Sequence, residues 1–199
     1  MKKILMLMPN GSEMLEAAAF IDVFGWARIA AGLDVSLIIA GENEYIPAAF
    51  GHSVRSDMVI DKIDITDYDG VALPGGFPRF GYFASAEKDS FTDILRQATL
   101  FGKPIAAVCT GSLVLARAGL LREKQAVIYP GEDGRWTTQL AQAGAIPGKG
   151  QLCVDGNIIT ADGPSAAVFA AFSLLAKITD RASALAVAEM MGYCPEDII

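Results

Sequence analysis

The segment from residue 104 to residue 121 constrains the fold of this chain most strongly. Four apolar residues, Ile105–Val108, are followed by Cys109, by a turn of small residues and then by a helical pattern that reaches Leu121. A strand that passes directly into a helix lifts the residue at the bend above the edge of a sheet. The segment therefore predicts a nucleophile elbow with cysteine at the bend.

Cys109 has two interpretations. At a helix N-terminus, free backbone N–H groups and the positive end of the helix dipole favour thiolate over thiol, which predicts a reactive cysteine. Cysteine is also among the most buried residue types, so a cysteine that ends an apolar strand can serve packing alone. The sequence is compatible with both.

Strand and helix patterns alternate along the whole chain. The predicted strands are 3–8, 34–40, 69–73, 105–109 and 125–129, with a hairpin at 152–160 and a hairpin or extended excursion at 46–60. The predicted helices are 12–31, 87–101, 112–121, 135–143, 165–178 and 181–191, the first with Ser12 as N-cap and Gly32 as its stop. We therefore expect one α/β domain over residues 1–199, a three-layer sandwich with helices on both faces of a mainly parallel sheet.

Composition excludes several classes of protein. Apolar residues make up 52% of the chain and charged residues 20%, which argues against disorder. The formal net charge of −7 argues against partners such as nucleic acid and anionic membrane. No stretch has the ~20 apolar residues of a membrane span, and the apolar run at the N-terminus is too short for a signal peptide.

The titratable residues also narrow the expected chemistry. The three cysteines are Cys109, Cys153 and Cys194; they form no CxxC pair, so free thiols in the cytoplasm are expected. With one histidine, His52, and scattered cysteines, no metal site is expected. No phosphate-binding loop or dinucleotide fingerprint is present, so no cofactor is expected.

An ordered set of motifs carries a family resemblance. The set comprises 73–76 (Leu-Pro-Gly-Gly), 106–111 (Ala-Ala-Val-Cys-Thr-Gly), the glutamates that open the first helix, and 160–164 (Thr-Ala-Asp-Gly-Pro) before an apolar helix. Together they resemble the ThiJ/PfpI superfamily, which includes the parkinsonism-associated deglycase. The resemblance runs from about residue 3 to about residue 178 and implies the flavodoxin-like fold of class I glutamine amidotransferases.

The resemblance assigns roles to particular residues. Cys109 matches the elbow cysteine and Glu16 the glutamate of the first helix, with Glu13 as a competing candidate. A carboxyl beside a thiolate should keep its proton, because like charge and burial both raise its pKa. Gly75 and Gly76 either form a turn that requires positive φ or, with the N–H of Thr110, bind a substrate oxyanion.

One position departs from the family pattern. Many catalytic members have histidine before the proline that follows the elbow helix, where this chain has Tyr129. A tyrosine hydroxyl, with a pKa near ~10, is a poor base at neutral pH, and His52 lies in a distant excursion. Tyr129 is therefore expected to line the pocket as a hydrogen-bond donor.

Three functions follow from the resemblance. The first is glyoxalase-like or deglycase-like chemistry on a small reactive carbonyl through Cys109 and Glu16. The second is a redox-responsive or stress-protective protein that senses oxidation at Cys109. The third is a cysteine amidase or protease-like hydrolase, which the absence of a histidine partner weakens most. The family also implies a homodimer.

Overall fold

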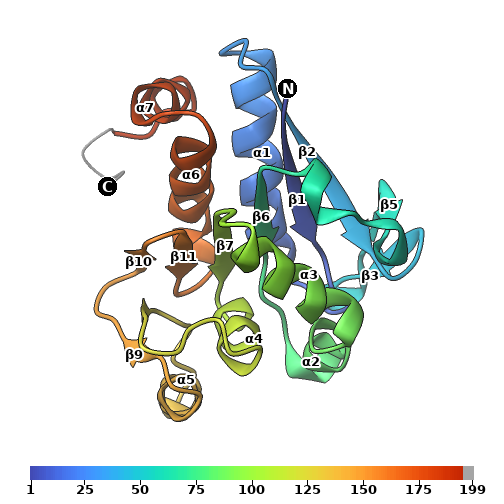
Figure 1. Cartoon of the computed structure of the whole chain (residues 1–199), viewed down its shortest axis with the longest axis vertical. Helices are drawn as coiled ribbons and strands as arrows, with labels where there is room; N and C mark the ends of the chain where they lie inside the picture. The colour runs from blue at the N-terminus through green and yellow to red at the C-terminus, as the bar shows by residue number, and fades with distance from the viewer. Residues whose placement is uncertain (195–199) are drawn as a thin grey trace.

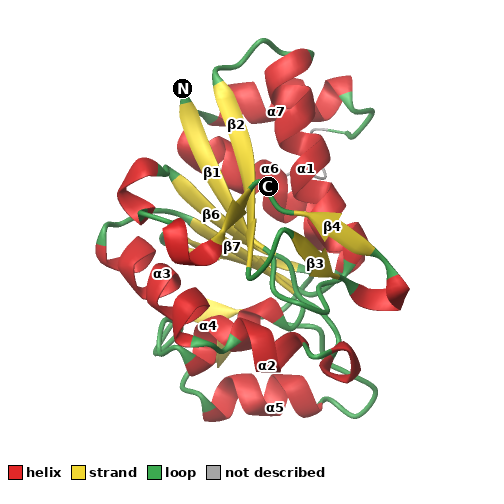
Figure 2. Ribbon diagram, turned by 90° about the vertical axis from the view of Figure 1, so that its right-hand side faces the viewer, coloured by secondary structure: helices red, strands yellow, loops and turns green. Residues whose placement is uncertain are grey.

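The computed structural model of the chain describes residues 1–194 and is built around a seven-stranded sheet (Figures 1 and 2). The strand order is β10-β11-β7-β6-β1-β2-β5, and every neighbouring pair is parallel except β10 with β11. The strands are β1 (Lys2–Leu7), β2 (Val35–Gly41), β5 (Met58–Val59), β6 (Gly70–Leu73), β7 (Ile105–Val108), β10 (Leu152–Asp155) and β11 (Ile158–Ala161). The predicted α/β class is confirmed.

Helices cover both faces of this sheet. One face carries α1 (Met14–Ile29), α6 (Ala167–Ile178) and α7 (Arg181–Met190); the other carries α2 (Tyr82–Ala86), α3 (Asp89–Leu100), α4 (Gly111–Arg117) and α5 (Arg135–Gln142). Side chains of β1 alternate between the two cores, with Ile4 and Met6 in the first and Leu5 and Leu7 in the second. Burial on both faces explains why β1 is a continuous apolar run rather than an alternating one.

The strand order places a ligand site at one end of the sheet. Without the two-residue edge strand β5, the parallel strands have the order 2-1-3-4-5 of flavodoxin-like folds. The chain passes from β1 to β2 on one side and to β6, β7 and β11 on the other. Such folds bind ligands where the order reverses, which here is the carboxyl ends of β1 and β6, beside α2 and α4 in Figure 1.

The predicted strand 125–129 is wrong in part. Only Gln125–Ala126 (β8) is a strand, and it pairs in parallel with β9 (Ile146–Pro147) outside the main sheet. The Val127 N–H donates to the Thr160 hydroxyl at 3.0 Å rather than to a strand carbonyl. The last backbone bond of this short ladder runs from the Gly148 N–H to the Ala126 carbonyl at 2.8 Å.

Several predicted boundaries also shift. Ser12 is not the N-cap of α1; Glu13 is, and its side chain accepts the Glu16 N–H, while the Ser12 hydroxyl donates to the Pro9 carbonyl. The predicted helix 87–101 begins at Asp89, after a separate short helix, α2. The excursion 46–60 does contain a hairpin, β3 (Tyr45–Pro47) with β4 (Ser53–Arg55).

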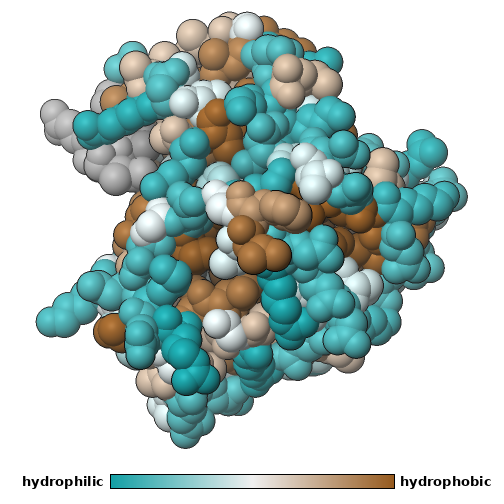
Figure 3. Space-filling view, viewed as in Figure 1, coloured by the Kyte–Doolittle hydropathy of each residue, from teal (hydrophilic) through white to brown (hydrophobic). Residues whose placement is uncertain are grey.

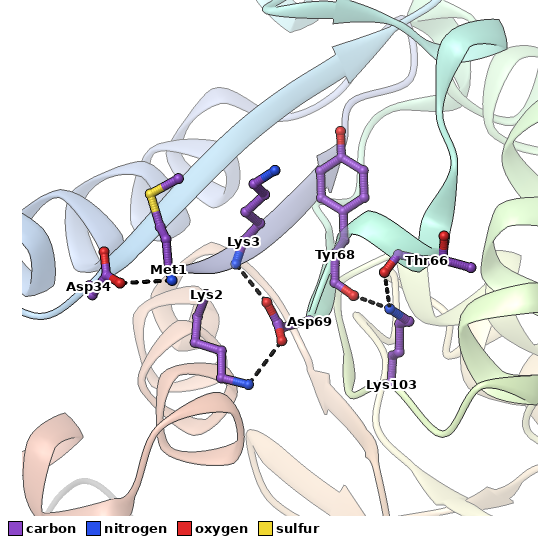
Figure 4. A network of polar contacts seen from close by, with 8 residues as sticks. All are labelled: Met1, Lys2, Lys3, Asp34, Thr66, Tyr68, Asp69 and Lys103. Carbon is purple, nitrogen blue, oxygen red and sulfur yellow. Dashed lines mark hydrogen bonds and ion pairs between the residues drawn. The ribbon is translucent and has the colours of Figure 1, made fainter.

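A polar network closes the end of the sheet that lies away from the switch point (Figure 4). Asp69 accepts the Lys3 N–H at 2.8 Å and the Lys2 ammonium at 3.0 Å, and the N-terminal amine pairs with Asp34 at 2.7 Å. Lys103 donates to the carbonyls of Thr66 and Tyr68. These contacts fix the amino ends of β1 and β6 relative to each other.

The face shown in Figure 3 is largely polar, with apolar side chains in separate patches. No helix within residues 1–194 is long and apolar enough to cross a membrane.

Candidate active site

The bend between β7 and α4 is a strained elbow. Cys109 has φ of 55°, in the left-handed region that non-glycine residues rarely adopt. Its N–H donates to the Ala161 carbonyl of β11 at 2.8 Å, which holds the bend against the neighbouring strand. The side chain is partly exposed and lines a cavity. The geometry is that of a nucleophile elbow, and Cys109 is not a packing residue alone.

Gly75 and Gly76 are required for close approach, not for a left-handed turn. Neither is among the positive-φ residues of the described chain. A Cβ on Gly75 would lie 2.6 Å from the Val108 carbonyl oxygen and 2.9 Å from Cys109 Cβ. A Cβ on Gly76 would lie 2.3 Å from the Gly11 carbonyl oxygen. The interpretation of these glycines as a positive-φ turn is therefore wrong.

The N–H groups of this loop already have partners inside the protein. Gly75 N–H donates to Glu16 Oε2 at 2.7 Å, and Gly76 N–H donates to Thr110 Oγ1 at 2.9 Å. Thr110 Oγ1 in turn donates to the Gly76 carbonyl at 2.8 Å. Gly75 and Gly76 thus position Glu16 and Thr110, which leaves the Thr110 N–H, directed at Cys109, as the backbone donor beside the sulfur.

Gly75→Ala should lower the free energy of unfolding by about 2–4 kcal/mol, because the new Cβ meets backbone atoms that cannot rotate away. Urea denaturation measures this loss. Gly25→Ala is the matched control: Gly25 lies in α1 with open space around it, so alanine there should stabilise by about 0.5–1 kcal/mol. Equal effects of the two substitutions would contradict the close approach.

Glu16 is a buried acid in the first turn of α1. Its side chain is fully buried, and burial, aided by the charge of Glu13 and opposed by the Gly75 N–H, raises its pKa to about 8. Glu16 therefore keeps its proton at neutral pH, as the sequence predicted. Its Oε1 has no partner of standard hydrogen-bond geometry, while the Cys109 thiol interacts with the same carboxyl closely enough to change the pKa of both groups.

The expectation of a thiolate stabilised by the helix N-terminus is not met. Burial and the neighbouring Glu16 raise the pKa of the Cys109 thiol above its ordinary value, and the Thr110 N–H only partly offsets them. In the interior, removing a charged group from water outweighs one hydrogen bond to that group. Cys109 and Glu16 therefore form one coupled pair in which burial favours the neutral form of both groups.

The competing residues take other roles. Glu13 lines the cavity, but its Oε2 accepts the Glu16 N–H at 2.8 Å and so caps α1. His52 is exposed in the β3–β4 hairpin and is not among the residues that line the cavity. Within residues 1–194, no three His, Cys, Asp or Glu side chains form a possible metal site.

The cavity at the elbow has a volume of about 620 Å³. Seven residues that the sequence analysis named, alone or in a motif, line it: Glu13, Glu16, Gly76, Cys109, Thr110, Tyr129 and Pro164. Gly75 does not line the cavity, and its N–H donates to Glu16. Phe77 and Gly131, at the ends of segments that the sequence places after strands, complete part of the wall. Sequence reasoning missed the remainder: Pro78, Arg79, Glu132, Arg135 and Trp136. The position of Arg79, three residues after the Pro-Gly-Gly motif, is a signal that could have indicated one of them.

Comparison with known proteins identifies the family. The DJ-1/PfpI family matches residues 2–177. The chain belongs to this family. It is 30% identical to DJ-1 homolog B of Arabidopsis thaliana over 92% of this chain and 39% of that protein, so it spans about two fifths of the plant relative's length. It is 27% identical to a deglycase from Pyrococcus horikoshii, over 82% of this chain and 91% of the relative.

Solved structures agree with this assignment. Drosophila melanogaster DJ-1beta superposes with a TM-score of 0.83 at 26% identity, covering 97% of this chain and 98% of that one. Oxidised Toxoplasma gondii DJ-1 superposes with a TM-score of 0.82 at 28% identity, covering 98% and 100%. The flavodoxin-like fold and the ThiJ/PfpI resemblance predicted from the sequence are confirmed.

Proposed function

We propose that this chain is a cysteine-dependent enzyme acting on small reactive carbonyl compounds, in the manner of a glyoxalase or deglycase. The observation that carries the proposal is the contact between a buried carboxyl of raised pKa, Glu16, and the thiol of the Cys109 elbow at the wall of an open cavity. The deglycase relative supports the reaction class.

The pair accounts for each proton of such a reaction. When Glu16 is ionised it takes the Cys109 proton as sulfur bonds to the aldehyde carbon, and it gives this proton to the carbonyl oxygen, held by the Thr110 N–H, to form a hemithioacetal. Ionised again, Glu16 removes the hydrogen of this carbon and returns it to the adjacent carbon. The hydroxyl proton moves from the first oxygen to the second in the same isomerisation, which leaves a thioester of a 2-hydroxy acid. Water cleaves the thioester, which releases a 2-hydroxy acid and restores the thiol.

Turnover of methylglyoxal to lactate tests the proposal, and its pH dependence tests the role of Glu16. Because the pair must lose one proton to be active, kcat/KM should rise about tenfold per pH unit and level off near the Glu16 pKa of about 8. Absence of turnover from pH 6 to 10 would end the enzymatic proposal.

Two alternatives have specific support. A redox-responsive role would use protonated Glu16 to donate a hydrogen bond to oxygen added to Cys109, and one structural relative is an oxidised DJ-1. Intact mass after mild peroxide would then show a gain of oxygen atoms at Cys109 without turnover. A water-adding role, related to the hydrolase alternative, is supported by an isonitrile hydratase from Pseudomonas putida, 32% identical over 64% of this chain and 53% of the relative. Tyr129, 44% exposed at the cavity, offers such a reaction a hydroxyl.

We also propose a homodimer in the cytoplasm. Leu15, Trp26 and Ile29 of α1 are 60%, 44% and 82% exposed. Their spacings of 11 and 3 residues bring them to one helix face, an apolar surface that a second copy would cover. Three free cysteines, Cys109, Cys153 and Cys194, fit a reducing compartment.

Trp26→Glu should convert the dimer to monomer, because it places a charge in the apolar contact. Light scattering across a concentration series measures the mass, with Phe101→Glu as control, an aromatic residue after α3 that is 54% exposed. A wild-type monomer at all concentrations would contradict the proposal.

A further inference from the structure

The cavity beside Cys109 is much larger than the smallest reactive carbonyls require. Its volume of about 620 Å³ lies in the range of sites that enclose drug-sized ligands. A three-carbon oxoaldehyde has five non-hydrogen atoms and would leave most of this space to water. The part of a substrate beyond the reacting carbonyl therefore has room to contact the wall.

The chemistry of that wall is aromatic. Phe77 follows the Gly75–Gly76 loop, Tyr129 follows β8, and Trp136 opens α5, so three separate segments each present a ring to one cavity. Phe77 is fixed by edge-to-face contacts with Phe50 and Phe80, at centroid distances of 5.2 and 6.1 Å. Rings held in this way are suited to a planar apolar group.

One cation on the same wall has no carboxylate partner. The Arg79 guanidinium stacks on Phe80 at 4.8 Å and on Phe77 at 5.7 Å, and no ion pair joins it to any residue within 1–194. The other cavity arginine, Arg135, stacks on Trp136 at 4.7 Å and has its Nε 4.0 Å from Asp133. Arg79 therefore presents unused N–H donors on an aromatic support, a geometry that recognises carboxylate.

We infer that the substrate carries an aromatic ring with a negatively charged group, the ring contacting Phe77 and Trp136 and the charge paired with Arg79. This rests on the proposed function for the reacting carbonyl and deepens it by naming the remainder of the substrate. Arg79 is then a specificity-determining residue that does not touch the reacting atoms.

Binding of an unreactive pair of probes tests the inference without turnover. Trp26→Phe leaves Trp136 as the only tryptophan, so its fluorescence reports on the cavity. 4-Acetylbenzoate should bind about tenfold more tightly than neutral acetophenone, and Arg79→Gln should remove that difference. Arg96→Gln, which removes an exposed positive charge from α3, should preserve it. Equal binding of the two probes, no saturable signal, or an unaltered difference in Arg79→Gln would overturn the inference.

Turnover separates failure of the inference from failure of the proposed function. If the proposed function holds, kcat/KM should increase from methylglyoxal to phenylglyoxal to 4-carboxyphenylglyoxal, and Arg79→Gln should lower only the last. Turnover of methylglyoxal at an equal or higher kcat/KM would overturn the inference and leave the function intact. If the probes bind in an Arg79-dependent way and none of the three aldehydes is turned over, the proposed function fails and the inference about the binding site stands.

Discussion

Cys109→Ser should abolish turnover of 2-oxoaldehydes, lowering kcat/KM on the order of 10³-fold or more. A serine hydroxyl is far less acidic than a thiol, and a carboxylate whose conjugate acid has a pKa of about 8 cannot deprotonate it. The substitution replaces one atom in a partly exposed side chain, so the elbow should retain its shape. The loss should appear in kcat, with binding of the unreactive probe unchanged.

Cys153→Ser and Cys194→Ser are the matched controls. Cys153 is partly exposed in β10, and Cys194 is exposed after α7; neither lines the cavity. Both variants should turn over methylglyoxal at the wild-type rate. Full activity in Cys109→Ser, or a large loss of activity in either control, would show that the reactive thiol is not Cys109.

The parts of the fold that local pattern determines could be predicted from the sequence. Apolar runs bounded by turn residues located β1, β6 and β7, and the strand-to-helix transition located Cys109. Residues 127–129 failed as a strand because the Val127 N–H bonds the side chain of Thr160, 33 positions away, instead of a strand carbonyl. A pattern of apolar residues contains no information about such a partner.

The same distinction applies to the site. The family motif placed Glu16 and Cys109 together, but it could not show that Gly76 N–H is already bonded to Thr110. Nor could it show that burial outweighs the helix N-terminus at Cys109. Arg79 and Trp136 join the cavity only through the tertiary arrangement of loops. The pairing of Glu16 with Cys109 was therefore predictable from the sequence. The competing effects of hydrogen bonds and burial on these groups, and the residues that form the cavity wall, were not.

The second large effect is a pH-dependent loss of stability caused by Glu16. Its pKa is about 8 in the folded protein against an ordinary value of 4.5, so the folded state binds the extra proton between these pH values. The contribution of Glu16 to the free energy of unfolding should therefore be greatest below pH 4.5. It should fall as pH rises and level off above about pH 8. The full change is on the order of 5 kcal/mol, from about 1.4 kcal/mol per pKa unit.

Glu16→Gln should remove this slope, because the amide is neutral at every pH and its oxygen can still accept the Gly75 N–H. Urea denaturation of both proteins at pH 5, 7 and 9 gives the difference in unfolding free energy, in which the titration of all other groups cancels. That difference should favour the variant increasingly toward pH 9. Glu189→Gln, an exposed acid of α7, controls for removal of one negative charge and should parallel the wild type. A wild-type slope in Glu16→Gln would mean that Glu16 is ionised at neutral pH, and the shared-proton mechanism at Cys109 would then fail with it.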